Sequence, residues 1–271
     1  PILLKHRKDL QIIQIWHSMG SMKKFGYTAL DTQEGVPART ARLLHMHENY
    51  TCVLASSPAY SRDLAAGFNC DEKIVRIMPL PRTDLLRSNN YRKKKRTEIL
   101  EAYPFLRGKK VILYCPTFRK CEDDMRTAVN QLANALNRQE EVLVIKPHPL
   151  SKISIDSPHV LCGTKFSTFD MLFAADIVIS DYSCIVYEAA FMGIPVYFYN
   201  FDMDKYLKER GLAIDYYKEI PGPASADPDV LMNAVHSQKY DMEQLKAFSE
   251  KYIKYSGHAG KDIARYILSF M

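Results

Sequence analysis

The segment Val142–Leu150, VLVIKPHPL, places a histidine at the end of an apolar run. Prolines on both sides of His148 fix their own φ angles and remove two backbone donors, which stiffens the chain around the imidazole. A rigidly held imidazole at the end of a strand suits contact with a phosphate or transfer of a proton. The alternative is a histidine that only satisfies a loop carbonyl, and the motif alone favours neither.

The segment Ala174–Pro195, AADIVISDYSCIVYEAAFMGIP, predicts a buried strand that stops at Ser180 and a helix that follows at once. Side-chain hydroxyls and free backbone N–H groups at a helix N-terminus form a site for a phosphate. Glu188 lies inside this helix, where its carboxylate can accept hydrogen bonds from ribose or polyol hydroxyls. The alternative is ordinary N-capping by Ser180 or Ser183, with Glu188 solvated.

A third segment, Val111–Arg119, reads VILYCPTFR and ends a predicted strand on a Pro-Thr-Phe-Arg turn. The Thr117 hydroxyl and the Arg119 guanidinium are suited to pyrophosphate oxygens, the arginine in bidentate fashion. The alternative is a turn with an exposed arginine.

These segments end apolar runs that alternate with helical stretches along the chain. Strand, helix and strand in repetition predict an α/β fold with parallel sheets and right-handed crossovers, and ligands of such sheets bind beyond the carboxyl ends of the strands. The first group of elements is short for a complete doubly wound domain, which indicates that early strands are missing. The predicted strands are 10–16, 51–55, 74–78, 111–115, 142–145, 159–161, 177–180 and 196–199, and the main predicted helices are 39–48, 125–138, 168–174, 183–192, 227–237 and 241–271.

The composition excludes several classes of protein. Apolar residues make up 47% and charged residues 25% of the 271 residues, which supports a real core and argues against a disordered tail. No run approaches the about 18 apolar residues of a membrane span. Six scattered cysteines without a CxxC pair indicate reduced thiols. No acidic pair has a spacing that indicates a metal site.

The net charge is +6, and basic residues bunch at Lys5–Lys8, Arg39–Arg42 and Arg92–Arg96. Such clusters suit a phosphate-bearing substrate, nucleic acid or an anionic membrane, or they are merely solvated. Nucleic acid is the least favoured partner, because no aromatic–basic interleaving or nucleic-acid motif is present.

Taken together, these segments resemble the family of CDP-glycerol:poly(glycerophosphate) glycerophosphotransferases, bacterial enzymes that build teichoic acids and related capsule polymers. The resemblance runs from about residue 11 to the end of the chain, and its motifs are specific as a set. The segment QIWHSMG looks like the family's Trp-His-Gly segment, and the Lys23-Lys24 pair follows it. The motifs are QIWHSMG (14–20), YCPTFR (114–119), IKPHP (145–149), ISDYS (179–183), IPVYF (194–198), YLKERG (206–211), PGP (221–223) and the closing segment 256–265.

The resemblance implies a GT-B fold, in which two Rossmann-like domains with parallel sheets face a cleft. Residues 1–88 would form a truncated N-terminal domain on the acceptor side, and residues 89–271 the CDP-donor-binding domain with closing C-terminal helices. His17 and His148 would be the catalytic histidines, one in each domain. No cofactor or metal is expected. The donor-binding residues implied are Thr117, Arg119, Lys146, Ser180, Asp181, Ser183 and Glu188.

Three positions depart from the family's pattern. Cys184 stands where a second serine is usual, Ser18 replaces the glycine after the histidine, and Glu188 takes the place of a common aspartate. A thiol is a weak hydrogen-bond donor. These changes bear on which donor is used more than on membership of the family.

The reaction implied is attack by a hydroxyl of a lipid-linked polymer on the β-phosphorus of CDP-glycerol or CDP-ribitol, with release of CMP. His17 is the candidate general base, and His148 would neutralise the pyrophosphate or protonate the leaving CMP, although the sequence does not order these two roles. The enzyme would be cytoplasmic and peripheral on the inner face of the cell membrane, where the basic clusters would meet anionic lipid.

Several alternatives stay open at this point. The chain also suits a GT-B UDP-sugar transferase or epimerase, or a non-catalytic fragment that binds nucleotide or polymer. Glycerol and ribitol donors are not distinguished, and neither are a primase and a polymerase.

Overall fold

The computed structural model describes residues 6–7, 9–119, 122–148, 150–151, 153–155, 159–237 and 239–270. Among the predicted features, Pro149 of the histidine motif, Lys5 and Lys8 of the first basic cluster, and Cys121 lie outside these residues. No helix in the described part of the chain is long and apolar enough to cross a membrane.

The chain divides into two compact units. The predicted boundary at residue 88 lies near the point where the chain first passes from one unit to the other. Two later segments return to the first unit, so the second unit is not a continuous stretch from 89 to 271. The first unit consists of Pro1–Leu85, Asp204–Glu219 and Ser249–Met271, and the second of Leu86–Met203 and Ile220–Phe248.

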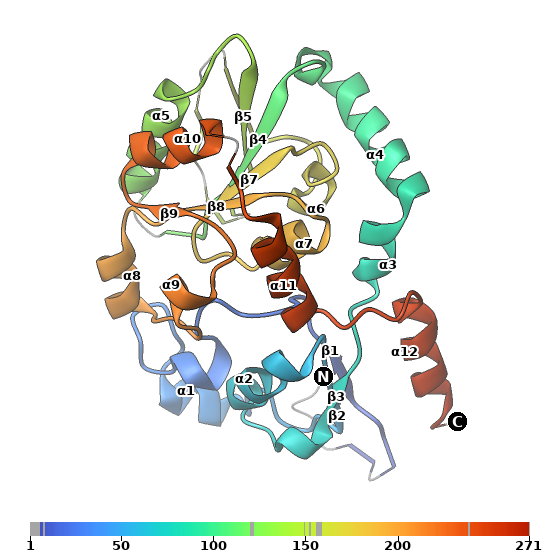
Figure 1. Cartoon of the computed structure of the whole chain (residues 1–271). Helices are drawn as coiled ribbons and strands as arrows, with labels where there is room; N and C mark the ends of the chain where they lie inside the picture. The colour runs from blue at the N-terminus through green and yellow to red at the C-terminus, as the bar shows by residue number, and fades with distance from the viewer. Residues whose placement is uncertain are drawn as a thin grey trace. The chain divides into compact units, whose positions relative to one another are not determined.

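The first unit contains a three-stranded parallel sheet in the order β1-β2-β3. Its central strand is buried throughout, as expected for an apolar run in a parallel sheet. Helix α2 (Pro58–Phe68) connects β2 to β3, with proline at its first position and Asn69 in the left-handed region at its C-cap (Figure 1). The strands are β1 (Ile13–Ile15), β2 (Cys52–Ala55) and β3 (Val75–Ile77).

Helix α1 (Ala38–Leu43) is shorter than the predicted helix 39–48. The chain beyond it cannot continue as a helix, because His45, His47 and Asn49 have φ angles of 47°, 61° and 68°. The short 3₁₀ helix η1 (Gly26–Ala29) and helices α9 (Tyr216–Glu219) and α12 (Ala259–Leu268) also belong to this unit.

Asp84, in helix α3 (Arg82–Arg87), holds the start of α12. Its carboxylate accepts hydrogen bonds from the backbone N–H groups of Ala259 and Gly260 at 2.9 and 2.8 Å, and from the Tyr255 hydroxyl at 3.0 Å. The N-cap residue of α12, His258, makes no capping bond with its own side chain. Asp84 therefore supplies the cap that the local sequence lacks.

Asp84→Ala is expected to lower the free energy of unfolding of the first unit by about 1–2 kcal/mol, because two N-terminal N–H groups of α12 lose their acceptor. Trp16 is the single tryptophan and lies in this unit, so its fluorescence during urea unfolding reports the change. The exposed Asp204→Ala is the control. An unchanged midpoint for Asp84→Ala would contradict the capping role.

The second unit is built on a six-stranded parallel sheet in the order β6-β5-β4-β7-β8-β9. The strand order reverses between β4 and β7, and in such sheets ligands bind beyond the carboxyl ends at this switch point. All five neighbouring pairs are parallel, as predicted. The strands are β4 (Lys110–Cys115), β5 (Glu141–Ile145), β6 (Val160–Cys162), β7 (Ile177–Ser180), β8 (Val196–Tyr199) and β9 (Ala224–Ser225).

Helices cover both faces of this sheet (Figure 1). Helices α5 and α10 pack on one face, where their apolar residues meet those of the central strands. Helices α4, α6 and α7 lie toward the other face. The bounds are α4 (Asn89–Ala102), α5 (Glu122–Asn134), α6 (Thr168–Met171), α7 (Ile185–Phe191) and α10 (Pro228–His236), while α8 (Met203–Glu209) and α11 (Met242–Tyr252) lie where the chain passes between units.

Other predicted helices also differ from those observed. The predicted helix 125–138 is shifted to Glu122–Asn134, and the predicted helix 168–174 ends at Met171. The predicted helix 183–192 begins only at Ile185, after a turn. The predicted tail helix 241–271 is two helices, α11 and α12, because the chain between them includes Gly257 with a φ of 94°. Strand β9 was not predicted.

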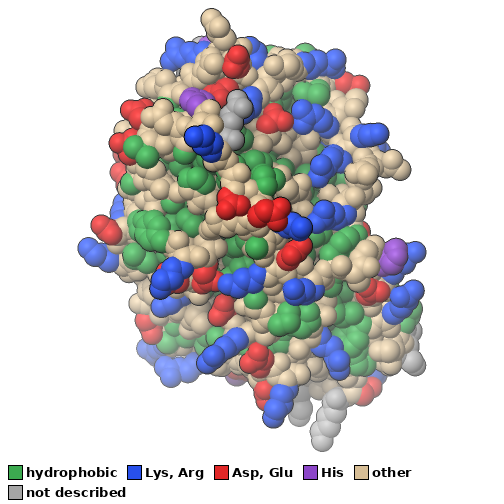
Figure 2. All heavy atoms as spheres, viewed as in Figure 1, with side chains coloured by type: hydrophobic (Ala, Val, Ile, Leu, Met, Phe, Trp, Pro, Cys, Tyr) green, Lys and Arg blue, Asp and Glu red, His purple; other side chains and the backbone are tan. Residues whose placement is uncertain are grey.

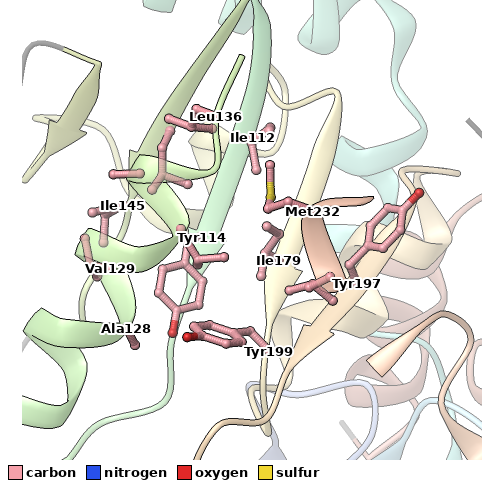
Figure 3. Close-up of a cluster of buried hydrophobic side chains, with 14 of the residues drawn as sticks. Ile112, Tyr114, Ala128, Val129, Leu136, Ile145, Ile179, Tyr197, Tyr199 and Met232 are labelled. Carbon is pink, nitrogen blue, oxygen red and sulfur yellow. The ribbon is translucent and has the colours of Figure 1, made fainter. Parts of the chain in front are cut away.

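The core of the second unit is mostly aliphatic but contains three tyrosines, of which Tyr114 and Tyr199 lie next to each other (Figure 3). Their ring centroids are 6.3 Å apart. The Tyr199 hydroxyl donates to Gln131 Oε1 at 3.0 Å, and burial raises the pKa of Tyr199 to about 12. Both tyrosines therefore remain neutral and anchor the end of the sheet next to the polar segments.

Basic side chains of the run on α4 make hydrogen bonds and ion pairs within the second unit. Arg96 donates to the carbonyl oxygens of Phe173 and Ala174, and Lys95 pairs with Glu98 at 2.7 Å and with Asp170 at 3.7 Å. Lys and Arg side chains gather along the position of α4 in Figure 2, interspersed with acidic ones. Arg92 is exposed and its Nη2 donates to the carbonyl oxygen of Met192 at 3.5 Å, while the exposed Lys93 and Lys94 remain available to an anionic partner.

Candidate functional site

Polar segments meet at the carboxyl ends of β4, β7 and β8, and Asp181 joins the first two. Its carboxylate accepts from the Thr117 N–H at 3.0 Å and from the Thr117 hydroxyl at 2.7 Å, and also from the N–H of Tyr182. The Asp181 side chain is completely buried. The predicted Thr-Phe-Arg and Ser-Asp-Tyr-Ser segments are therefore brought together, as neighbouring parallel strands require.

Arg119 lies at the centre of this network, with 8% of its side chain exposed. Its Nη2 donates to Asp181 at 2.8 Å and to Asp202 at 3.1 Å, and its Nε donates to Asp202 at 2.6 Å. Its Nη1 donates to the carbonyl oxygens of Thr117 and Phe118 at 2.8 and 3.4 Å. All five guanidinium N–H groups are thus directed at protein acceptors. The two carboxylates keep this guanidinium charged.

Ser180 and Lys146 also use their polar groups within the protein. The buried Ser180 hydroxyl donates to the Cys115 carbonyl at 2.8 Å and ties β7 to β4. The Lys146 ammonium donates to the carbonyl oxygens of Thr164 and Phe166 at 3.2 and 2.6 Å, and so holds the loop after β6. Burial lowers the pKa of Lys146.

Ser183 and Cys184 form the turn that leads into α7. Both are partly accessible, and among the described residues the Ser183 hydroxyl has no hydrogen-bond partner. Cys184 occupies the N-cap and makes no capping bond through its side chain. Glu188, in the first turn of α7, is 3% exposed. Ser183 is therefore the predicted site residue of this segment whose side chain is best placed to receive a ligand.

His148 follows β5 and is exposed. Its Nδ1 accepts from the N–H of Leu150 at 3.3 Å, which places the proton of the neutral imidazole on Nε2. Its ring lies 5.5 Å from that of Phe118, the residue between Thr117 and Arg119. A small pocket lies beside it, lined by Pro116–Arg119, Glu122, Met125, Pro147, His148 and Ser151.

His17 follows β1 in the first unit and keeps an exposed surface. The Trp16 ring lies 4.0 Å from its imidazole and packs in turn against Phe25 and Phe68, at 5.3 and 5.0 Å. A Cβ on Gly67 would lie 2.2 Å from the Phe25 ring, so glycine is required for this packing. This aromatic cluster holds the backbone next to the histidine, and among the described residues no protein group hydrogen-bonds to either ring nitrogen.

The surroundings of His17 favour a neutral imidazole. Burial lowers its pKa from the ordinary 6.5, and the positive charges of Arg82 and Lys23 lower it further. A neutral imidazole can accept a proton at pH 7, as a general base must.

With His17 as the predicted general base, the acid limb of the pH–activity profile is expected to have its midpoint below pH 6.5, because protonation of His17 at its lowered pKa would remove the base. Arg82→Gln removes one opposing charge, so the pKa rises toward 6.5 and the limb moves to higher pH. The exposed Arg39→Gln is the control. The pH dependence of kcat/KM for the three proteins measures the shift, and a limb that does not move in Arg82→Gln would exclude His17 as the titrating group.

Two members of the network were not predicted from the sequence, Asp202 and Tyr182. Tyr182 is buried and donates its hydroxyl to Asp202 at 3.2 Å. The signal for Asp202 was its place shortly after an apolar run, three residues beyond the end of β8. Asp181 and Thr117 follow their strands by one and two residues. No group of metal-ligating side chains is present in the described part of the chain.

Comparison with known proteins gives consistent matches over nearly the whole chain. The family model described as CDP-Glycerol:Poly(glycerophosphate) glycerophosphotransferase matches residues 1–269. A teichoic acid ribitol-phosphate primase of Bacillus spizizenii is 32% identical over 98% of this chain and 71% of its own length. A teichoic acid glycerol-phosphate primase of Bacillus subtilis is 30% identical over 98% of this chain and 70% of its own.

The fold also has a solved counterpart. The structure of the wall teichoic acid polymerase TagF superposes on this chain with a TM-score of 0.81 at 21% sequence identity. The aligned region covers 97% of this chain and 68% of the TagF chain. At this identity the likeness shows the fold, an α/β architecture with parallel sheets.

Proposed function

Because the chain belongs to the CDP-glycerol:poly(glycerophosphate) glycerophosphotransferase family, we propose that it transfers glycerol phosphate or ribitol phosphate from a CDP-activated donor to a teichoic-acid-like or capsule polymer. The observation that carries this function is the match of the family model to residues 1–269. The two primases described above, one for each polyol, support a glycerophosphotransferase-like enzyme and leave the polyol open.

In the proposed reaction an acceptor hydroxyl oxygen forms a bond to the β-phosphorus of the donor. The bond from that phosphorus to the bridging oxygen breaks, and CMP leaves with the bonding electron pair. His17 takes the hydroxyl proton. His148 acts as the imidazolium: it neutralises the pyrophosphate, or it gives its Nε2 proton to the leaving CMP and returns to the neutral imidazole. The two histidines can exchange these roles, but the lowered pKa of His17 favours it as the base.

The polar network of the second unit is proposed as the donor site. Ser183 would donate to a phosphate oxygen, and Glu188 would accept from a ribose or polyol hydroxyl. The other predicted donor-site residues have their polar groups engaged within the protein, so they would act indirectly, by holding the loops that contact the donor. These residues are Thr117, Arg119, Lys146, Ser180 and Asp181.

The acceptor is proposed to be lipid-linked, and to be used at the inner face of the cell membrane by a cytoplasmic, peripherally bound enzyme. In the GT-B fold that we propose, the first unit serves the acceptor. The exposed lysines of α4 and the arginines of α1 would meet anionic lipid or the polyanionic product.

Calorimetric titration with CDP-glycerol, CDP-ribitol, CDP and UDP-GlcNAc tests this function. We expect binding of CDP and of at least one CDP-polyol, and weaker binding of that polyol donor to Ser183→Ala. The preferred polyol names the donor. Binding of UDP-GlcNAc without any cytidine nucleotide would refute the proposal and indicate a sugar-nucleotide enzyme.

A further inference from the structure

Asp202 stands at the end of β8 and closes the polar network from a third strand. Its carboxylate accepts from Arg119 Nε at 2.6 Å, from Arg119 Nη2 at 3.1 Å and from the Tyr182 hydroxyl at 3.2 Å. Its side chain is 8% exposed, as is that of Arg119. A bidentate arginine–carboxylate pair shielded from water is held more firmly than an exposed pair, because its geometry is fixed and water does not compete for it.

The bidentate bond determines where the guanidinium points. With Asp202 on Nε and one Nη2 hydrogen, the remaining donors reach Asp181 and the carbonyl oxygen of Thr117. Arg119 thereby fixes the turn after β4 to the turn after β7. The second of these turns, residues 181–183, carries Ser183, whose hydroxyl is proposed to meet the donor phosphate.

The charge of the network argues against direct anion binding by Arg119. One guanidinium faces two carboxylates, Asp181 and Asp202, so the cluster is net negative as long as both are ionised. The Arg119 charge is compensated by the two carboxylates and its N–H groups are already hydrogen-bonded, so it has no free donor for a pyrophosphate oxygen. The role left to Arg119 is to hold the turns in place.

We infer that Asp202 is a positioning residue of the donor site, which holds Arg119 so that the turns after β4 and β7 keep the geometry that binds the donor phosphates. This inference rests on the proposed function. Asp202 itself need not touch the ligand, and it acts through Arg119.

Asp202→Asn separates positioning from electrostatics, because the two predict opposite signs. The amide is isosteric but offers one acceptor oxygen, so the bidentate bond is lost and the turns loosen. Positioning therefore predicts that the Kd for CDP rises, by about 10-fold for the loss of a charge-assisted bond. If Asp202 affected binding only through its negative charge, removal of that charge would reduce the repulsion of the anionic CDP and lower its Kd.

The experiment is calorimetric titration of the wild type and its variants with CDP at 25 °C, with the thermal midpoint of each protein measured alongside. Asp204→Asn is the matched control, since it makes the same chemical change two residues away at an exposed position. Asp202→Asn is expected to weaken binding while still folded at 25 °C, and Asp204→Asn to leave it unchanged. Arg119→Gln combined with Asp202→Asn is expected to bind CDP no more weakly than Arg119→Gln alone, because both substitutions break one unit.

Equal or tighter CDP binding by Asp202→Asn would overturn the inference, and so would additive losses in the double variant. In either case the proposed function stands, because the wild type still binds CDP. A folded wild type that binds neither CDP nor a CDP-polyol would overturn both. Asp202→Asn keeps the side-chain volume and is therefore expected to fold even if the more disruptive Asp202→Ala does not, so the inference can be tested in either case.

Discussion

His17→Ala is expected to lower turnover at least ~100-fold while leaving the affinity for CDP unchanged. A positioned general base contributes roughly 10²–10⁴-fold to a proton-transfer step, and alanine has no group to replace it. His17 lies in the first unit, whereas the proposed donor site lies in the second, so donor affinity is not expected to change. Release of CMP at saturating donor measures the first quantity, and calorimetry with CDP measures the second.

His45→Ala provides the control for this substitution. His45 is exposed on the same unit, and its Nδ1 pairs with Glu48 at 2.9 Å. Its removal is expected to leave turnover near that of the wild type. Near-normal turnover of His17→Ala would remove His17 from the mechanism, and a large rise in its Kd for CDP would instead indicate a binding role.

Asp181→Ala is expected to cause the largest loss of stability, about 3–5 kcal/mol, together with loss of CDP binding. The substitution leaves Arg119 short of one of its two buried carboxylates, and it leaves the N–H and hydroxyl of Thr117 without their acceptor. Removing one partner of a buried ion pair costs more than the pair contributes, because the remaining charge stays buried without full compensation.

Urea unfolding followed by far-ultraviolet circular dichroism measures this loss, since the fluorescence of Trp16 reports only the first unit. Asp181→Asn should lose less stability, because it keeps the shape and one acceptor oxygen. Asp229→Ala, at an exposed position of the same unit, should unfold like the wild type. A midpoint of Asp181→Ala within error of the wild type would show that the network does not stabilise the fold.

Most of the α/β organisation was predictable from the sequence, for local reasons. Apolar runs closed by serine, proline, asparagine or a charged residue identified β2, β4, β5, β7 and β8 to within about one residue. Helix ends were less predictable where they depended on single backbone conformations, as at the end of α1 and between α11 and α12. The return of the chain's later segments to the first unit had no local signal, because it depends on packing between residues far apart in the chain.

The position of the candidate site was also a local property. In a parallel sheet the residues that follow the strands must meet at one edge, so Thr117, His148, Asp181 and Ser183 could be assigned to that edge from the sequence. The family motifs added His17 and the nature of the donor. Local sequence patterns were therefore sufficient to predict the family, the reaction class and the residues at the strand ends.

What each polar side chain does at that edge was decided by the tertiary structure. The motif around Arg119 indicated a pyrophosphate ligand, yet the fold surrounds its guanidinium with Asp181 and Asp202, which lie 62 and 83 residues further along the chain. Hydrogen bonds of buried groups depend on which acceptors the fold brings within about 3 Å, and residue type and local spacing do not contain that distance. For the same reason the sequence shows Asp202 only as a single carboxylate after β8. Its bond to Arg119, which links β8 to the turns after β4 and β7, exists only in the folded chain.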